Sequence, residues 1–150
     1  MGKTGAMSAR FPSEVVRRRA DIGEALANVE RALSNPVGTG EAWRVRVAAS
    51  LAVLGHLTDE QVEAYTTPDG VFDEVLGSAP RLAPQVDRLR SAIVELAPRI
   101  DKLVSAVADA SPNDVREDAL GILGDLVRAR QKIADLVWDA FSLDLGGHSS

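Results

Sequence analysis

The chain has no cysteine and only two histidines, His56 and His148, among its 150 residues. Without thiols there is no disulfide bridge, no thiolate zinc or iron–sulfur site and no cysteine nucleophile. Two histidines are too few for a histidine-rich di-iron site, and neither follows an acidic residue at the Glu-x-x-His spacing of metal-binding helical bundles. The pair also offers no partner spacing for a Ser-His-Asp or acid–base arrangement. We therefore expect a protein that is not an enzyme, with His56 on a flank or at the surface of its helix.

Long hydrophobic runs and concentrated positive charge are also missing. No run approaches the roughly 20 apolar residues of a membrane span, and the N-terminus lacks the apolar stretch of an export signal. The formal net charge is −5, and the 17 basic residues are scattered except for Arg17, Arg18 and Arg19, which fan around a helix axis. We expect a cytoplasmic protein that binds neither membranes nor nucleic acids.

Apolar residues recur at steps of three and four in four long segments, which turn-forming residues separate. The separating turns begin at Ser34, Thr67 and Ser111. The third segment has the most regular pattern, with apolar residues at Leu82, Val86, Leu89, Ile93, Leu96, Ile100, Leu103 and Val107. Strands are not expected, because apolar and polar residues nowhere alternate for long. The pattern predicts an all-α fold, an up-down-up-down four-helix bundle with a short extra helix at 71–76 between the second and third helices.

The length fits one domain with a substantial core. We expect a flexible leader at 1–10, a single four-helix bundle domain at 11–147 and a tail at 148–150. Two local patterns affect the expected helices. The sequence from Thr58 to Gln61 resembles a capping box shortly after Gly55, which predicts that the second helix breaks and restarts there. Pro98 is expected on the outer face of the third helix, where it should bend that helix.

Two stretches of sequence form a more specific pattern. They read "YTTPDGVFDEVLGSAPRLAPQVDRLRSAIVEL" and "ARQKIADLVWDAFSLDLGG". Their most specific motifs are Pro68-Asp69-Gly70, Ala79-Pro80-Arg81-Leu82, Ala134-Asp135-Leu136 and Asp144-Leu145-Gly146-Gly147. The chain resembles the actinobacterial branch of the hemerythrin-like (HHE cation-binding) proteins. The resemblance covers nearly the whole chain, and these motifs are its most specific parts. The resemblance implies a four-helix bundle, and in that family the bundle binds iron for oxygen, nitric oxide or peroxide chemistry.

The positions at which that family has metal ligands hold other residue types here. The resemblance places these positions at Arg19, near Gln61 and Thr66, at Ala92 and Ile93, and at Ala129. None of these residues is a histidine or a carboxylate, so the resemblance implies a degenerate member with a lost metal site. Ile93 and Ala129 also lie on the apolar helix faces that periodicity alone identifies, where an apolar side chain favours a filled core.

Four polar residues fall on the buried side of the helical pattern, and they are expected in one region of the bundle. These residues are Arg19, Thr58, Gln61 and Tyr65. A buried guanidinium needs a partner, so Arg19 either reaches the rim or joins a hydrogen-bonded cluster with Gln61 and Tyr65. The alternatives are a small pocket for an anion or an organic ligand, and metal binding by the carboxylates of Glu63, Asp125 or Asp135.

Three functional hypotheses follow. The first is a metal-free, cofactor-free bundle that acts as a binding, regulatory or scaffolding module. Its partner would be a second copy or another protein at the C-terminal helix, because "VWDAFSLDLGG" is rich in apolar groups for a terminus. The second is a surviving di-iron protein with redox or gas-binding activity. The third is a binder of a small apolar or anionic ligand in a dry cavity of more than about 100 Å³ at Ala92 and Ala129.

Overall fold

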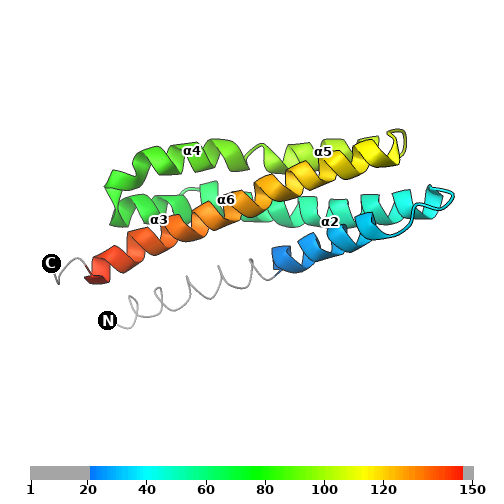
Figure 1. Cartoon of the computed structure of the whole chain (residues 1–150). Helices are drawn as coiled ribbons and strands as arrows, with labels where there is room; N and C mark the ends of the chain where they lie inside the picture. The colour runs from blue at the N-terminus through cyan, green and yellow to red at the C-terminus, as the bar shows by residue number, and fades with distance from the viewer. Residues whose placement is uncertain (1–20, 147–150) are drawn as a thin grey trace.

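The computed structural model describes residues 21–146, and all regular structure in that range is helical, with no strand. The elements are an N-terminal helix at 21–34, α2 (Glu41–Thr66), α3 (Val71–Ser78), the 3₁₀ turn η1 (Pro80–Leu82), α4 (Ala83–Ile93), α5 (Leu96–Ala106) and α6 (Pro112–Gly146). Figure 1 shows the long helices lying side by side, with α4 and α5 following one another along the same edge. The all-α prediction and the short extra helix are confirmed for this range, while the predicted leader and tail lie outside it.

The packing places α2 against α5, and α6 against both α4 and α5. One connected hydrophobic core joins all of these helices to α3 and to the N-terminal helix. Every residue of the regular apolar pattern predicted for the third segment, from Leu82 to Val107, is buried. Among the described helices, none is long and apolar enough to cross a lipid bilayer.

Helix α2 is continuous, so the predicted break after Gly55 is wrong. Thr58 does not start a new helix, because it faces the core with only 1% of its surface exposed. Gly55 serves a different purpose, since a Cβ atom there would lie 3.1 Å from Cγ2 of Ile100. The glycine therefore permits a close approach between α2 and α5 and does not end a helix.

The expected bend near Pro98 occurs, and it takes the form of an interruption between α4 and α5. Residues Val94 and Glu95 form a turn between the two helices. Proline has no N–H to donate to the carbonyl four residues earlier, and its ring collides with that carbonyl. For Pro98 that carbonyl belongs to Val94, which explains why the interruption lies at this point. Pro98 itself is exposed, as predicted.

At one end of the bundle Arg116 of α6 binds the C-terminal end of the N-terminal helix. Its Nε donates to the carbonyl of Leu33 over 3.0 Å, and its Nη2 donates to the carbonyl of Asn35 over 3.3 Å. The guanidinium carbon also lies 5.2 Å from the ring centroid of Trp43. The last carbonyls of a helix have no partner within the helix and attract cations. Arg116 satisfies the carbonyl of Leu33 in the last turn and that of Asn35 just after it, and it joins three helices.

Two further arginines act in the same way at other helix ends. Arg44 of α2 donates from Nη1 to the carbonyls of Val107 and, over 2.6 Å, Ala110, which follow the end of α5. Arg90 of α4 donates over 3.4 Å to the carbonyl of Thr66, the last residue of α2. The planar guanidinium with its five donors suits such contacts better than a lysine ammonium does.

Candidate functional site

The polar residues that the sequence places toward the core of α2 lie together inside the bundle. Thr58, Gln61 and Tyr65 are 1%, 4% and 5% exposed, because their spacing of three and four puts them on one helix face. All three line an interior cavity of about 10 Å³. Arg19, the fourth member of the predicted cluster, lies outside the described residues.

This cavity lies between α2, the interruption between α4 and α5, and α6. Its remaining wall is formed by Val62, Ile93, Leu96, Leu126, Ala129, Arg130 and Ile133. Ile93 and Ala129, both buried, therefore share the cavity wall with Gln61 and Tyr65. Most of the wall is apolar, which matches the filled core expected from periodicity.

The other two predicted positions do not face the cavity. Thr66 is partly buried and its hydroxyl donates over 2.8 Å to the carbonyl of Val62 in its own helix. Ala92 is exposed at the surface. His56 is exposed too, with Nε2 3.6 Å from a carboxylate oxygen of Glu60, so the prediction of a flank or surface position is correct.

The cavity residues do not suit a metal ion. The polar groups in its described wall are a hydroxyl, an amide, a phenol and a guanidinium, with neither a carboxylate nor an imidazole. Iron, manganese and zinc sites in proteins are built mainly from those two missing groups and from thiolates, and the single phenol of Tyr65 does not complete such a ligand set. Across residues 21–142, where the structure describes side chains, no group of three His, Cys, Asp or Glu side chains is close enough to hold a metal ion.

The carboxylates considered as leftover ligands are held apart on the surface. Glu63 is exposed, and Asp135 is exposed and accepts a hydrogen bond of 2.9 Å from the side chain of Gln131. Asp125 is bound by two arginines, Arg99 of α5 and Arg128 of its own helix. None of the three lines the interior cavity.

An open groove of about 600 Å³ runs over the surface between α4, α5 and α6. Its apolar lining includes Ala92 and Ala129, the two positions where the sequence suggested a dry cavity. Its charged lining consists of Arg88, Arg99, Arg128, Lys132, Glu95, Asp125, Asp135 and Asp139. With four charges of each sign the groove is neither dry nor of one sign, so it does not favour the small apolar ligand.

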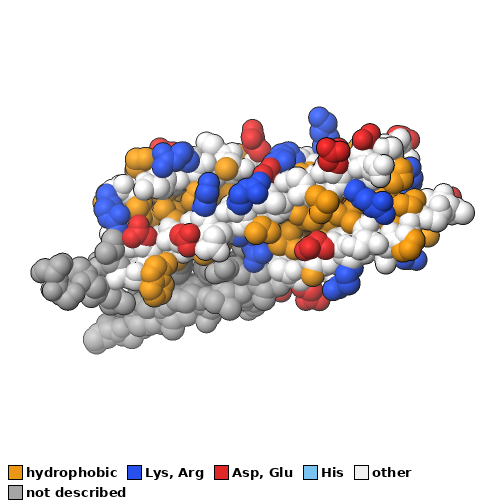
Figure 2. Space-filling view, viewed as in Figure 1, with side chains coloured by type: hydrophobic (Ala, Val, Ile, Leu, Met, Phe, Trp, Pro, Cys, Tyr) orange, Lys and Arg blue, Asp and Glu red, His pale blue; other side chains and the backbone are white. Residues whose placement is uncertain are grey.

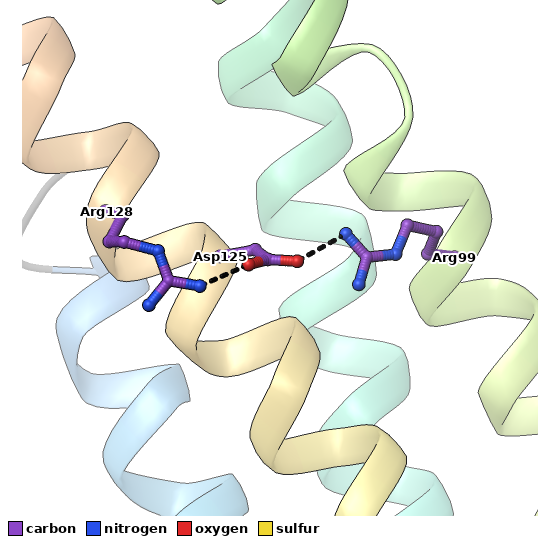
Figure 3. A network of polar contacts seen from close by, with 3 residues as sticks. All are labelled: Arg99, Asp125 and Arg128. Atoms are coloured by element: carbon purple, nitrogen blue, oxygen red, sulfur yellow. Dashed lines mark hydrogen bonds and ion pairs between the residues drawn. The ribbon is translucent and has the colours of Figure 1, made fainter.

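Asp125 links the two sides of this groove (Figure 3). One carboxylate oxygen accepts from Nη1 of Arg99 over 2.9 Å, and the other accepts from Nη2 of Arg128. The pKa of Asp125 lies below the ordinary value of an aspartate. The hydrogen bond from Arg99 has the largest effect on this pKa, and the hydrogen bond from Arg128 has the second largest. The network ties α5 to α6 beside the groove.

The lowered pKa of Asp125 predicts a small, pH-dependent stabilisation. A depressed folded-state pKa stabilises the protein above the unfolded-state pKa, and this stabilisation is lost as pH falls through the folded-state pKa. Because all three side chains are exposed by 41% or more, we expect at most about 1 kcal/mol at neutral pH. Urea unfolding of Asp125→Asn should show this loss at neutral pH and little loss at acidic pH. The control is Asp87→Asn on the exposed surface of α4, and it should lose no stability at either pH. An equal loss for Asp125→Asn at both pH values would contradict the prediction.

The outer face of α6 exposes three large apolar side chains. Trp138 is 74% exposed, Leu120 57% and Val127 52%. On the face seen in Figure 2, hydrophobic side chains are visible between charged groups of both signs. A tryptophan side chain exposed to this extent is uncommon in folded proteins.

Two parts of these sites escaped the sequence reasoning. Arg130 follows Ala129 directly, and its spacing of four from Leu126 and three from Ile133 could have placed it beside the cavity. The helical spacing of Leu120, Val127 and Trp138 could have placed them on one face, but the inner face of the same helix has the more regular apolar pattern.

No family model matches the chain, and no match was found among curated proteins or among solved structures. The hemerythrin-like resemblance therefore stays a hypothesis that rests on the motifs in the sequence.

Proposed function

We propose that this chain is a metal-free, hemerythrin-like bundle, with its four long helical segments running up-down-up-down, that acts by binding a protein partner. It has no enzymatic activity of its own. The interior supports this proposal, because Ile93 and Ala129 occupy the core at two of the positions that the resemblance assigns to metal ligands. The polar residues in the described wall of the cavity are Thr58, Gln61, Tyr65 and Arg130, and none of them carries a negative charge.

The observation that carries the proposal is the exposed face of α6, which we name the α6 outer face and define by Leu120, Val127 and Trp138. These residues lie seven and eleven positions apart, which at about 100° per residue places them within roughly 20° of one another. Between them, the steps of four and three continue through Gly124, Gln131 and Ala134. Such spacing is typical of a helix stripe that packs against another helix.

The size and chemistry of this face suit a protein partner. From Leu120 to Trp138 the stripe extends about 27 Å at 1.5 Å per residue. Tryptophan is the residue type most enriched among side chains that dominate binding energy, provided that surrounding contacts exclude water from it. Gly124 and Ala134 are small and would let a partner helix approach closely.

Photo-crosslinking in the native cell tests this proposal. A photoreactive residue at Val127 should crosslink to a discrete partner, and the mass of the product distinguishes a second copy of the chain from another protein. The same residue at Val53, which is 55% exposed on α2, is the matched control and should give no such product. Trp138→Ser should abolish the crosslink from position 127. Equal crosslinking from both positions, or a crosslink that survives Trp138→Ser, would contradict the proposal.

The two other hypotheses have less support. A di-iron centre needs ligands that the described wall of the cavity does not supply. An organic ligand needs far more room than the interior cavity of about 10 Å³.

A further inference from the structure

The interior cavity contains two buried polar atoms whose hydrogen-bonding capacity is unused. Oγ1 of Thr58 and Nε2 of Gln61 have no hydrogen-bond partner among the described residues. Both side chains are more than nine-tenths buried, so bulk water does not reach them. Buried polar groups in folded proteins almost always find a partner, because an unsatisfied donor or acceptor is costly.

The two residues line the same small cavity. They are three positions apart on α2, so their side chains are neighbours on one helix face. One small molecule in the cavity would therefore lie beside both. The cavity volume of about 10 Å³ is close to the space that a single water molecule needs, roughly 10–15 Å³.

The surroundings limit what that molecule can be. Ile93, Leu126 and Ile133 form apolar wall, and no described lining residue carries a negative charge. A cation is therefore disfavoured, and an organic molecule does not fit. A small neutral molecule fits, if it accepts a hydrogen bond from Gln61 Nε2 and exchanges one with the Thr58 hydroxyl.

We infer that Thr58 and Gln61 form a binding site for one ordered water molecule between α2, the interruption between α4 and α5, and α6. The water completes the hydrogen bonding of both side chains and belongs to the folded core. This site goes beyond the proposed function, because it is interior and does not depend on any partner at the α6 outer face. A site for one water molecule is smaller than the pocket for an anion or an organic ligand that the sequence analysis gave as an alternative.

Two measurements on the full chain test the inference. A high-resolution crystal structure should show one water within hydrogen-bond distance of Thr58 Oγ1 and Gln61 Nε2. Oxygen-17 relaxation dispersion in solution should show that the double variant Thr58→Val/Gln61→Leu has lost one long-lived internal water. The control Thr66→Val, whose hydroxyl already donates to the carbonyl of Val62, should keep that water.

The wild-type protein alone can overturn the inference, even if the double variant does not fold. A well-ordered cavity without water density would do so, as would density for a chloride ion at that place. In solution, a double variant that folds and retains every long-lived water would also overturn it. Thr58→Ser, which preserves the hydroxyl, should retain the water and serves as the second variant.

Discussion

Replacing Phe72 with alanine should lower the free energy of unfolding by about 3–5 kcal/mol, the usual cost of emptying a buried aromatic position. Phe72 is completely buried, although it belongs to α3, a helix of only 8 residues. Its ring centroid lies 5.6 Å from that of Tyr65, and the guanidinium of Arg90 lies 5.4 Å above it. The side chain therefore anchors α3 to α2 and α4, and such a short helix has little stability of its own.

Urea denaturation followed by circular dichroism measures this effect. Phe72→Leu is the control, because it keeps most of the apolar volume and should cost less than about 1.5 kcal/mol. If the alanine and leucine variants lose the same small amount, α3 is not docked as the structure shows.

Gly70→Ala should also be strongly destabilising, by about 1–3 kcal/mol or more. A Cβ atom at Gly70 would lie 2.5 Å from the carbonyl oxygen of Ala64 and 2.8 Å from that of Thr67. Both are backbone atoms that cannot rotate away, so the turn itself has to move. That movement would weaken two backbone hydrogen bonds. The Gly70 N–H donates to the carbonyl of Thr67 over 2.8 Å, and the Glu74 N–H donates to the carbonyl of Gly70 at the start of α3.

The matched control is Gly77→Ala in α3, where a Cβ atom would have nothing within 4 Å. Because alanine favours helix more than glycine does, this variant should be neutral or gain up to about 1 kcal/mol. The same urea titration compares the two glycines. A Gly70→Ala variant as stable as Gly77→Ala would show that the turn adapts at no cost.

The regular parts of the fold could be predicted because burial imposes a simple period on the sequence. The eight inward positions from Leu82 to Val107 and the inward residues of α2 from Trp43 to Tyr65 all proved buried. The prediction failed where local chemistry and packing compete. Thr58 has the sequence context of a helix cap, but it lies on the same buried face of α2 as Leu54 and Tyr65, and packing of that face favours a continuous helix.

The candidate sites could be predicted only in part, because surface side chains follow no such period. The grouping of Thr58, Gln61 and Tyr65 followed from helix geometry and is confirmed. The network of Asp125 with Arg99 joins residues far apart in the sequence, and its formation depends on how α5 and α6 are placed. The exposure of Trp138 depends likewise on the absence of a covering helix among the described residues, which no local pattern encodes.

The most direct test of the central claim, that this bundle holds no metal, is the iron content of the chain after reconstitution. The protein would be purified without a histidine tag, incubated anaerobically with ferrous iron and desalted. Bound metal per chain and the visible absorption spectrum would then be measured. We predict no bound iron and no visible absorption, because the described cavity wall offers a hydroxyl, an amide, one phenol, a guanidinium and apolar groups, without a carboxylate or an imidazole. Two irons per chain with oxo-bridge absorption would contradict the claim.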